Sequence, residues 1–543
     1  MSASHKKQLR KEQNAAQMTE KQKAAAAEAK KLRIYSIIFA VAIVLMVCVV
    51  IFTTVSNSGF VARNTTALTV DGVKISNAEM NHYSVDTVNG FVNEWGQLIS
   101  LSGLVATTPL NMQVIDEETG ETWADHFLEQ AIDEARYVYA LYNAARAEGR
   151  TLSEESITSI ESSMSSIAAA ATAYGYGSTD DYIAAMYGRG CNEETFRHYA
   201  EVQYLAGEYS NDYYNNMTLT DEEIAQESEE NGADYASFSY NYYYLPLSGF
   251  YEDLEKDENG ISSYTPEQKA AALAKAEATA KEIAESVNSI EELDAAIKAL
   301  EMNKDIESAA STPCVDFAKE YIGDYLVDWV VDPSRKPGDT TYVPGETMTY
   351  DDDGNEVKTV NGYYVAYFVE REENNFPLVN VRHILIPHEG GSFDEYGNIV
   401  YSEAEKLATY AKAEEILNGF IEANGTEADF EALANEQSKD PGSNTKGGLY
   451  EDIYPGQMVE SFNDWCFDES RKPGDTGIVT SENGCHIMFF SSFSDIIYRE
   501  YMIDSALRAS KTEEWSSALT EAAEMTVKNL KHVNTGLTLN AGA

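Results

Sequence analysis

Apolar residues follow three patterns along the chain, and each pattern predicts a different kind of element. Residues 34–55 (IYSIIFAVAIVLMVCVVIFTTV) carry no charge and are long enough to cross the core of a bilayer as one helix. From about residue 122 to 231, apolar residues recur at steps of three and four, which predicts amphipathic helices. One such face is formed by Leu128, Ile132, Ala135, Val138 and Tyr142. Beyond Asp234, β-rich runs ended by Pro or Gly predict strands and turns.

Two shorter features frame these regions. Residues 67–76 (ALTVDGVKIS) place Asp71-Gly72 between two alternating runs, a strong signal for a two-residue β-hairpin. Near the C-terminus, apolar residues again follow a helical spacing that needs a packing partner. They are Ile496, Ile503, Leu507, Trp515 and Leu519.

The heptapeptide SRKPGDT occurs twice, at 334–340 and 470–476. Its flanks agree as well, since WVVD precedes the first copy and WCFD the second. Such self-similarity predicts a duplicated structural unit. Within it, Lys-Pro-Gly-Asp fits a type II turn, with Pro at the second and Gly at the third position.

Around each heptapeptide the pattern predicts the order β-α-α-(loop)-α-β-β. The first strands are SFSYNYYYLP (237–246) and LVNVRHILIP (378–387), and the last are VNGYYVAYFV (360–369) and ENGCHIMFFS (482–491). The first copy is longer by an insertion near TMTYDDDGNEV. That acidic run lacks the distant Glu of an EF-hand loop, so a solvated Asp-Gly hairpin turn is favoured over a calcium site.

Charge indicates an orientation in a membrane. Residues 1–33 hold nine Lys and Arg against three Glu, whereas the rest of the chain holds 30 basic and 87 acidic residues. The positive-inside rule places the N-terminus in the cytoplasm and everything after about Ser56 outside. A cleaved signal peptide is the alternative, but its basic region would be unusually long and SNSGFVARN offers no clear cleavage site. An uncleaved signal anchor is favoured.

The acidic exterior argues against nucleic-acid binding, which needs clustered Lys and Arg. Four cysteines beyond the apolar run are too few for a disulfide framework and lack zinc-site spacing. Whether Cys466 and Cys485 pair stays open. No metal and no cofactor is expected.

The second copy contains residues with chemical potential that the first copy lacks. His383 lies in its first strand (VRHILI) and His486 in its last (NGCHIMFF). Between them come QSKDPGSNTKGG, which contains Asp440, and GQMVESF, which contains Met458 and Phe462. With the K-P-G-D turn, these motifs in this order resemble the parvulin family of peptidyl-prolyl cis/trans isomerases over about 115 residues. The hairpin and helices before them resemble, more weakly, the chaperone part of secreted foldases of the PrsA and SurA type.

The resemblance implies roles for individual residues. His383 and His486 correspond to the paired active-site histidines, and Asp440 to a position where the family has Cys or Asp. Substrate-binding positions fall on Tyr450, Met458, Phe462 and Asn483. The family's GGDLG reads GGLYE here, with Tyr450 in place of a pocket Leu, and Asn483 stands where Ser or Thr is common.

In the first copy, Tyr242 and Tyr364 stand at the two histidine positions, and the D-P-G-S…GG run is missing. We expect an inactive, parvulin-like domain that serves as a spacer or a client-binding surface. A hydrolase would need an activated Ser or Cys beside His486. Its neighbour Cys485 must face the other side of the strand, so no such nucleophile is expected.

The fold class expected is α+β: an N-terminal transmembrane helix, a helical SurA-like chaperone region, two tandem parvulin-like domains of antiparallel sheet with helices, and a C-terminal helix. The boundaries expected are 1–33 (cytoplasmic basic tail), 34–55 (signal anchor), 56–233 (chaperone region), 234–375 (degenerate domain), 376–492 (isomerase domain) and 493–543 (C-terminal helical segment).

The function expected is an extracytoplasmic peptidyl-prolyl isomerase and chaperone, anchored in the cell membrane by one helix. Its partners would be unfolded or newly exported polypeptides with Xaa-Pro bonds and no nucleic acid, with a homodimer left as an option. The alternative is a non-catalytic chaperone in which both parvulin-like domains only hold clients.

Overall fold

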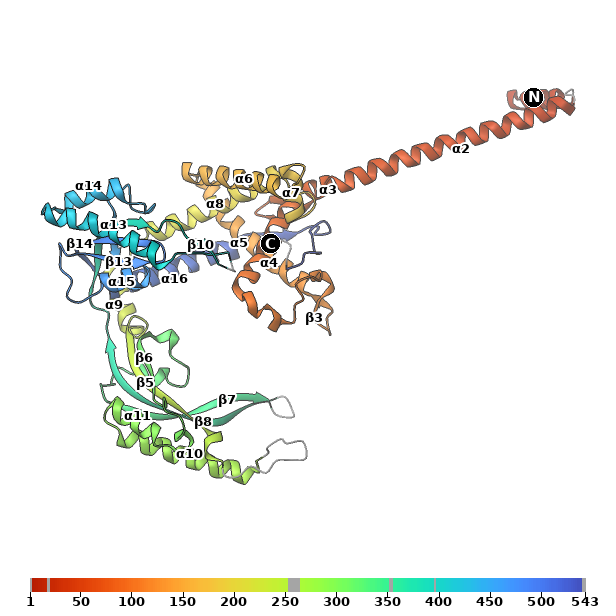
Figure 1. Cartoon of the computed structure of the whole chain (residues 1–543). Coiled ribbons are helices and arrows are strands. Elements are labelled where there is room, and N and C mark those ends of the chain that lie inside the picture. Colours follow the sequence, from red (N-terminus) through yellow and green to blue (C-terminus); the bar gives the residue numbers. More distant parts are fainter. Residues whose placement is uncertain (1, 17–19, 252–263, 351–354, 395–396, 540–543) are drawn as a thin grey trace. The chain divides into compact units, whose positions relative to one another are not determined.

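In the computed structural model, which describes residues 2–16, 20–251, 264–350, 355–394 and 397–539, the uncharged run lies inside one long helix. This helix, α2 (Glu20–Asn57), follows α1 (Ala3–Ala16) (Figure 1). It extends well before the apolar run because Ala, Lys and Glu are good helix formers. Its segment Glu28–Val50, of mean hydropathy 2.6, is long and apolar enough to cross a membrane.

The chain divides into two compact units, one made of Met1–Met217 with Ala509–Ala543 and the other of Thr218–Arg508. Both helices and antiparallel sheets occur, so the mixed fold class is confirmed. After α2, the first unit contains α3 (Phe60–Asn64), β1 (Thr66–Val70), β2 (Val73–Ser76), α4 (Asn77–Trp95), β3 (Val114–Asp116), β4 (Glu121–Thr122), α5 (Trp123–Ala147), α6 (Glu154–Ala173), α7 (Thr179–Tyr187), α8 (Glu193–Asn216) and β15 (Met525–Val527).

The first unit holds a three-stranded sheet of order β15-β1-β2. Strands β1 and β2 form the predicted hairpin, and Asp71 and Gly72 at its turn have φ of 49° and 78°. Both values suit a turn that requires positive φ at its two central residues. The third strand was not predicted: Val527 in β15 pairs with Leu68 in β1, so the C-terminal segment completes this sheet.

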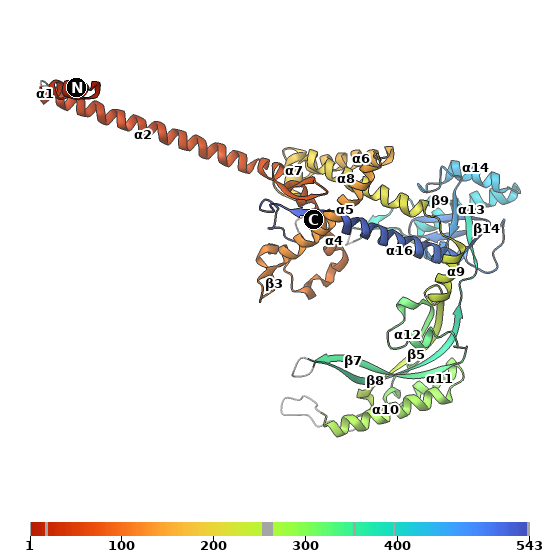
Figure 2. The same ribbon diagram turned by 180° about the vertical axis from the view of Figure 1, so that it is seen from behind.

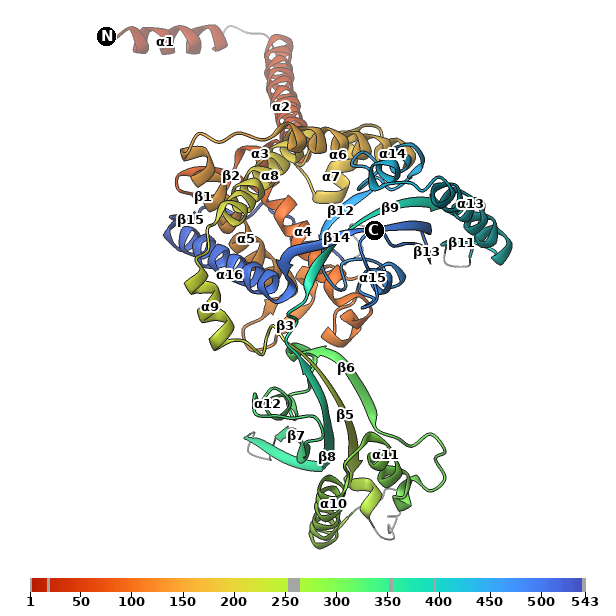
Figure 3. The same cartoon turned by 90° about the vertical axis from the view of Figure 1, so that its left-hand side faces the viewer.

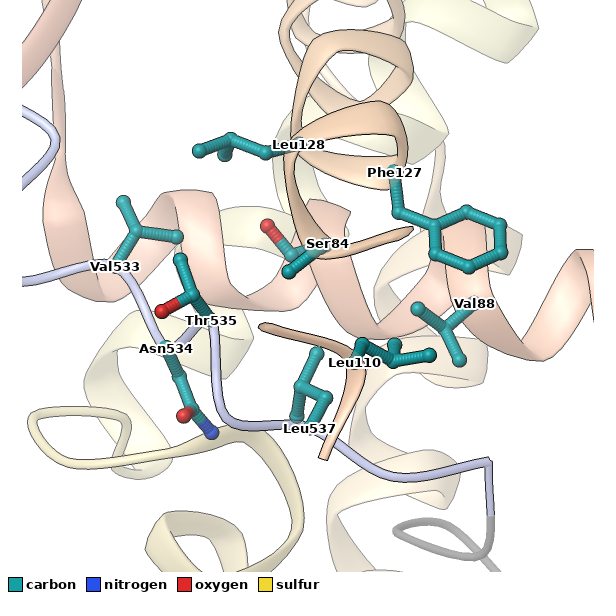
Figure 4. A pocket seen from close by; sticks show the side chains of 10 residues that line it. Ser84, Val88, Leu110, Phe127, Leu128, Val533, Asn534, Thr535 and Leu537 are labelled. Atoms are coloured by element: carbon teal, nitrogen blue, oxygen red, sulfur yellow. The ribbon is translucent and has the colours of Figure 1, made fainter. Parts of the chain in front are cut away.

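Side chains of the C-terminal segment also enter the core of the first unit. Val533 and Leu537 are 7% exposed and pack with residues of α4 and α5. Figure 4 shows them around a cavity that Val88 and Phe127 help to close. The cavity measures about 10 Å³, so it holds at most one water molecule and is a packing feature.

The second unit contains two four-stranded antiparallel sheets with the same strand order, β6-β5-β8-β7 and β12-β9-β14-β13. The segment that forms the first sheet contains α9 (Asp221–Glu230), β5 (Ser237–Pro246), α10 (Pro266–Ser286), α11 (Ile290–Lys298), β6 (Thr312–Ala318), α12 (Val327–Val330), β7 (Thr340–Tyr350) and β8 (Glu356–Glu372). The second comprises β9 (Pro377–Pro387), β10 (Ser392–Phe393), β11 (Ile399–Val400), α13 (Glu403–Glu422), α14 (Glu427–Gln437), β12 (Leu449–Ile453), α15 (Glu460–Cys466), β13 (Thr476–Ser481) and β14 (Gly484–Ile497). Helix α16 (Tyr498–Ala522) follows.

This order departs from the predicted one at two places. The loop expected after the second helix of each copy contains an edge strand, β6 or β12. The acidic insertion of the first copy joins β7 to β8, which pair up to Tyr350 and Glu356. The predicted Asp-Gly turn between them, 351–354, lies outside the described residues.

Helices cover both faces of each sheet. Figure 3 shows α13 and α14 on one side of the second sheet and α15 on the other. In the first sheet, α10 and α11 lie on one side and α12 on the other (Figure 2). Cys466 and Cys485 are both free and buried. They belong to clusters on opposite faces of the second sheet, which answers the open pairing question.

The duplicated heptapeptide makes the same contacts beside both sheets: a type II turn that hydrogen-bonds to a central strand, and an Arg that packs on a Trp. We call this set of contacts the latch. Beside the second sheet, Asp475 N donates to Lys472 O (3.0 Å) and Gly474 has φ of 92°, as a type II turn requires. Gly474 N also donates to Phe490 O on β14 (2.8 Å). The Arg471 guanidinium lies 4.4 Å from the Trp465 ring centre and donates to Trp465 O.

The first latch repeats these contacts. Gly338 N donates to Phe368 O on β8 (2.9 Å), and the guanidinium of Arg335 lies 4.5 Å from the Trp329 ring centre. The repeated sequence therefore ties a short helix to a strand, which is a structural task, and the chemistry must lie elsewhere.

Candidate active site

Two histidines meet on one face of the second sheet. The antiparallel register of β9 and β14 pairs His383 with Met488 and His486 with Leu385. Because alternate residues of a strand face the same side, both imidazoles emerge on the face that α15 covers. Their Nδ1 atoms lie 3.1 Å apart, and the residues are 3% and 6% exposed.

A carboxylate holds the first histidine from the loop after α14. Oδ2 of Asp440 accepts hydrogen bonds from His383 Nε2 (3.0 Å), Ser443 Oγ (2.5 Å) and the Tyr450 hydroxyl (3.0 Å). These donors, His383 foremost, keep the pKa of Asp440 well below its usual range. Burial and the neighbouring Asp440 carboxylate raise the pKa of Tyr450 to about 12. At neutral pH, Asp440 is therefore an anion and Tyr450 a hydrogen-bond donor.

The hydrogen-bond partners of His383 and His486 indicate which ring nitrogen carries the proton in each imidazole. With the proton of His383 on Nε2, facing Asp440, its Nδ1 accepts from His486 Nδ1–H. His486 Nε2 then accepts from the hydroxyl of Ser481 at 2.8 Å. Burial lowers the pKa of His486 to about 4, helped by the adjacent His383, so this imidazole is neutral at pH 7. The result is a chain Asp440–His383–His486–Ser481.

An apolar wall stands against the imidazoles. Phe462 of α15 is 2% exposed and lies edge-on to both rings, with centroids 5.3 Å from His383 and 5.6 Å from His486. Met458 packs against the same cluster, and the Tyr450 ring centroid lies 5.5 Å from that of His383. Cys485 is buried on the opposite face of the sheet. The face thus offers an apolar socket beside fixed polar groups. Its thiol, Cys466 of α15, is packed inside the same apolar cluster, and burial raises its pKa to about 12.

The structure brings together all the predicted site residues except Asn483, which lies apart from the imidazoles. Its side chain is exposed at the β13–β14 turn, where its backbone N–H donates to Ser481 Oγ (3.1 Å). Sequence reasoning missed Ser443 and Ser481. Ser443 could have been found from its place in the D-P-G-S motif, three residues after Asp440.

The first sheet has tyrosines where the second has histidines. Tyr242 pairs with Ala366 and Tyr364 with Tyr244, the same diagonal arrangement as the two histidines. The rings of Tyr242 and Tyr364 have centroids 6.1 Å apart, and Tyr325 stacks on Tyr364 at 3.7 Å. This face therefore presents aromatic surface and hydroxyls, without imidazole.

The low pKa of His486 predicts a dependence of stability on pH. An unfolded His titrates near 6.5. Between pH 6.5 and about 4 the unfolded chain thus binds a proton that folded His486 does not. Stability should be unaffected by this group above pH 6.5 and should fall by about 1.4 kcal/mol for each pH unit of acidification below it.

The direct measurement is an NMR titration of ¹³C-labelled histidine, with His486→Gln to assign the resonance. A His486 titration midpoint near 6.5 in the folded protein would show that water reaches this imidazole and that burial does not lower its pKa.

Within the described residues, no group of three or more His, Cys, Asp or Glu side chains is placed to hold a metal ion. Residues 363–490 match the PPIC-type PPIase domain, the parvulin type of peptidyl-prolyl isomerase. The family resemblance expected from the motifs is confirmed for this part of the chain. No curated protein matches the chain.

Similar solved structures include two PrsA proteins, of which the one from Bacillus cereus is a peptidyl-prolyl isomerase. PrsA from Bacillus cereus is 24% identical, with a TM-score of 0.18 over 30% of this chain and 55% of that one. PrsA from Bacillus subtilis is 22% identical, with a TM-score of 0.18 over 29% and 54%. A structure of SurA-like chaperones from Campylobacter jejuni is 22% identical, with a TM-score of 0.15 over 28% and 56%. The chain spans little more than half the length of these proteins.

Proposed function

We propose that this chain, which contains a PPIC-type PPIase domain, is an active peptidyl-prolyl cis/trans isomerase and chaperone for polypeptides that leave the cytoplasm. The observation that supports the activity is the series of hydrogen bonds that links Asp440, His383, His486 and Ser481, beside the apolar ring of Phe462. In this proposal His383, Asp440 and His486 are the catalytic residues. Tyr450, Met458 and Phe462 form the proline socket.

The mechanism needs no nucleophile. Rotation about a peptide bond is opposed by a resonance barrier of roughly 18–20 kcal/mol. In the twisted state resonance is lost, and the imide is less polar and more amine-like. A socket that holds the proline ring on Phe462 and excludes water favours this state over the planar one. The histidine pair, oriented by Asp440, offers fixed polar groups to the rotating imide.

The proposal is tested by two-dimensional NMR exchange on an Xaa-Pro peptide with the full chain in detergent. Uncatalysed exchange takes tens of seconds or longer. We expect catalytic amounts of the protein to bring it into the sub-second range. A folded protein that binds the peptide and leaves its exchange rate unchanged would favour the non-catalytic, client-holding alternative.

The first sheet is, in this proposal, a degenerate parvulin-like domain. Its shared strand order and its latch support this assignment, and Tyr242 and Tyr364 at the histidine positions support a loss of catalysis. With a pKa near 10, tyrosine cannot reproduce an imidazole pair. The domain then acts as a spacer or a surface for clients, and the helical first unit as a chaperone region.

For the N-terminal region we propose an uncleaved anchor with a cytoplasmic N-terminus. The apolar length of α2 and the basic residues 1–33 support it. We expect protein purified from membranes to retain residues 34–55. N-terminal sequencing checks this, and a mature terminus near residues 56–65 would instead identify a cleaved signal peptide.

A further inference from the structure

A cleft of about 910 Å³ opens beside the histidine pair, on the same domain. We call it the flanking cleft. Ser481, which bonds His486, also lines it, so the cleft begins one hydrogen bond from the imidazoles. Its volume is that of a ligand-binding pocket. Asn483, which the family resemblance places among the substrate-binding positions, also lines the cleft, but the mechanism proposed above does not use it.

A third histidine is buried at this cleft. His388, at the end of β9, is 7% exposed, and its Nδ1 lies 3.1 Å from Thr409 Oγ1. The Thr409 hydroxyl donates its own proton to Glu405 O (3.1 Å), so His388 Nδ1 must be the donor to Thr409. The other ring nitrogen, Nε2, has no partner in the described part of the chain and is not sealed from solvent. Because His388 lines the flanking cleft, this nitrogen can serve there as a hydrogen-bond acceptor.

The rim of the cleft is negatively charged. Of its described residues, Asp394, Glu460 and Glu482 are acidic and only Lys406 is basic, and Glu403 holds the Lys406 ammonium at 3.2 Å. A cation in the cleft would gain from this field, whereas an anion or a phosphate would be repelled.

The walls suit a long side chain with an apolar stem. Ile399, Val400 and Val459 line the cleft and are 54%, 50% and 46% exposed. The methylenes of Lys or Arg can cover such surface while their charged ends reach polar groups. A short polar residue would leave these side chains in water.

Position relates the cleft to the substrate. Phe462, against which the proposed proline ring packs, lies edge-on to His486, and Ser481 connects His486 to the flanking cleft, so a residue next to the proline can reach the cleft. We propose that the flanking cleft selects Lys or Arg immediately before proline, with His388 Nε2 accepting a hydrogen bond from its charged end. This inference rests on the proposed isomerase function and adds a substrate class to it.

The experiment compares matched Lys-Pro, Leu-Pro and Glu-Pro peptides by NMR exchange with the full chain in detergent, at pH 8, where imidazoles are ordinarily neutral. We expect kcat/KM in the order Lys-Pro, Leu-Pro, Glu-Pro. Glu460→Gln with Glu482→Gln should lower the Lys-Pro to Glu-Pro ratio by roughly three- to tenfold, as for two partly exposed charge pairs.

The control carries the same change in net charge away from the cleft. Glu415→Gln with Glu422→Gln alters two exposed residues of α13 that do not line it, and should leave the ratio within about twofold. His388→Phe removes the acceptor and should lower the ratio, whereas His388→Gln keeps an acceptor oxygen and should partly restore it.

The outcomes separate the two proposals. Equal catalysis of all three peptides, or faster turnover of a phospho-Ser-Pro than of a Glu-Pro peptide, would overturn the selectivity and leave the isomerase function intact. If no peptide is isomerised, the function fails, and fluorescence anisotropy with labelled peptides still tests the cleft. Lys-Pro binding weakened by Glu460→Gln with Glu482→Gln would support it, and binding unaffected by that change would overturn it.

Discussion

Replacing His486 by alanine is expected to slow catalysed exchange of an Xaa-Pro bond by about 10²-fold, the usual scale for a positioned polar group in a site. The variant removes the acceptor of the Ser481 hydroxyl and the partner of His383 Nδ1. Asp440→Ala should have an effect of the same order, because it releases His383, Ser443 and Tyr450 together. Exchange measured on a Leu-Pro peptide checks both.

Tyr364→Ala is the matched control from the first sheet. Tyr364 occupies the position equivalent to His486 and stacks on Tyr325 at 3.7 Å. We expect an unchanged isomerisation rate and a loss of stability of about 1–2 kcal/mol from the lost aromatic contact. Circular dichroism on each variant separates unfolding from lost catalysis. An equal fall in rate for well-folded Tyr364→Ala and His486→Ala would mean that the first sheet also carries chemistry.

The site was largely accessible to sequence reasoning because its parts lie in short, ordered motifs. Alternation along β9 and β14 places His383 and His486 on one face without knowledge of the rest of the fold. Asp440 and Phe462 come from motifs whose order is known from a family, and the structure brings both against the imidazoles. Their roles in catalysis remain predictions.

Ser481 and the edge strands were harder to predict for physical reasons. Ser481 reaches His486 across the β13–β14 hairpin, and which hydroxyl does so depends on register, since Ser481 pairs with Gly484. A one-residue error of register moves every side chain to the other face. Strand β12 is five residues long and follows a Gly-rich loop, so it carries little periodicity to detect.

The pairing of β15 with β1, which completes the sheet of the first unit, could not be predicted from local sequence patterns. Strand β15 has three residues, and it pairs with β1 across more than 450 positions of sequence. The signal for such a contact is not hydrophobic spacing but the unpaired edge of the β1–β2 hairpin. A two-stranded hairpin is marginal alone, and a third strand paired with its edge makes a sheet that is more stable when its apolar face packs in a core.

Asn77 allows a test of how the C-terminal segment is held in the first unit. Its replacement by alanine is expected to lower the free energy of unfolding of this unit by about 3 kcal/mol, roughly 1 kcal/mol for each of three lost hydrogen bonds. The side chain is fully buried at the start of α4. Its Nδ2 donates to Thr65 O and Asn529 O, both at 2.9 Å, and its Oδ1 accepts from His532 N at 3.1 Å. One amide thus joins the residue before β1 to two residues that follow β15.

Alanine at this position would deprive Asn529 O and His532 N, both partly buried in these bonds, of their side-chain partner, whereas Thr65 O keeps a hydrogen bond from Asn77 N (3.0 Å). Hydrogen–deuterium exchange in residues 525–533 should therefore become faster by about 10²-fold, the factor in the opening equilibrium that corresponds to about 3 kcal/mol. Asn111→Ala is the control: Asn111 also touches this segment, through Thr535 Oγ1 at 3.4 Å, but it is exposed. It should shift stability by no more than about 0.5 kcal/mol. Similar exchange in the two variants would mean that β15 is held by strand pairing and apolar packing, with the buried amide contributing little.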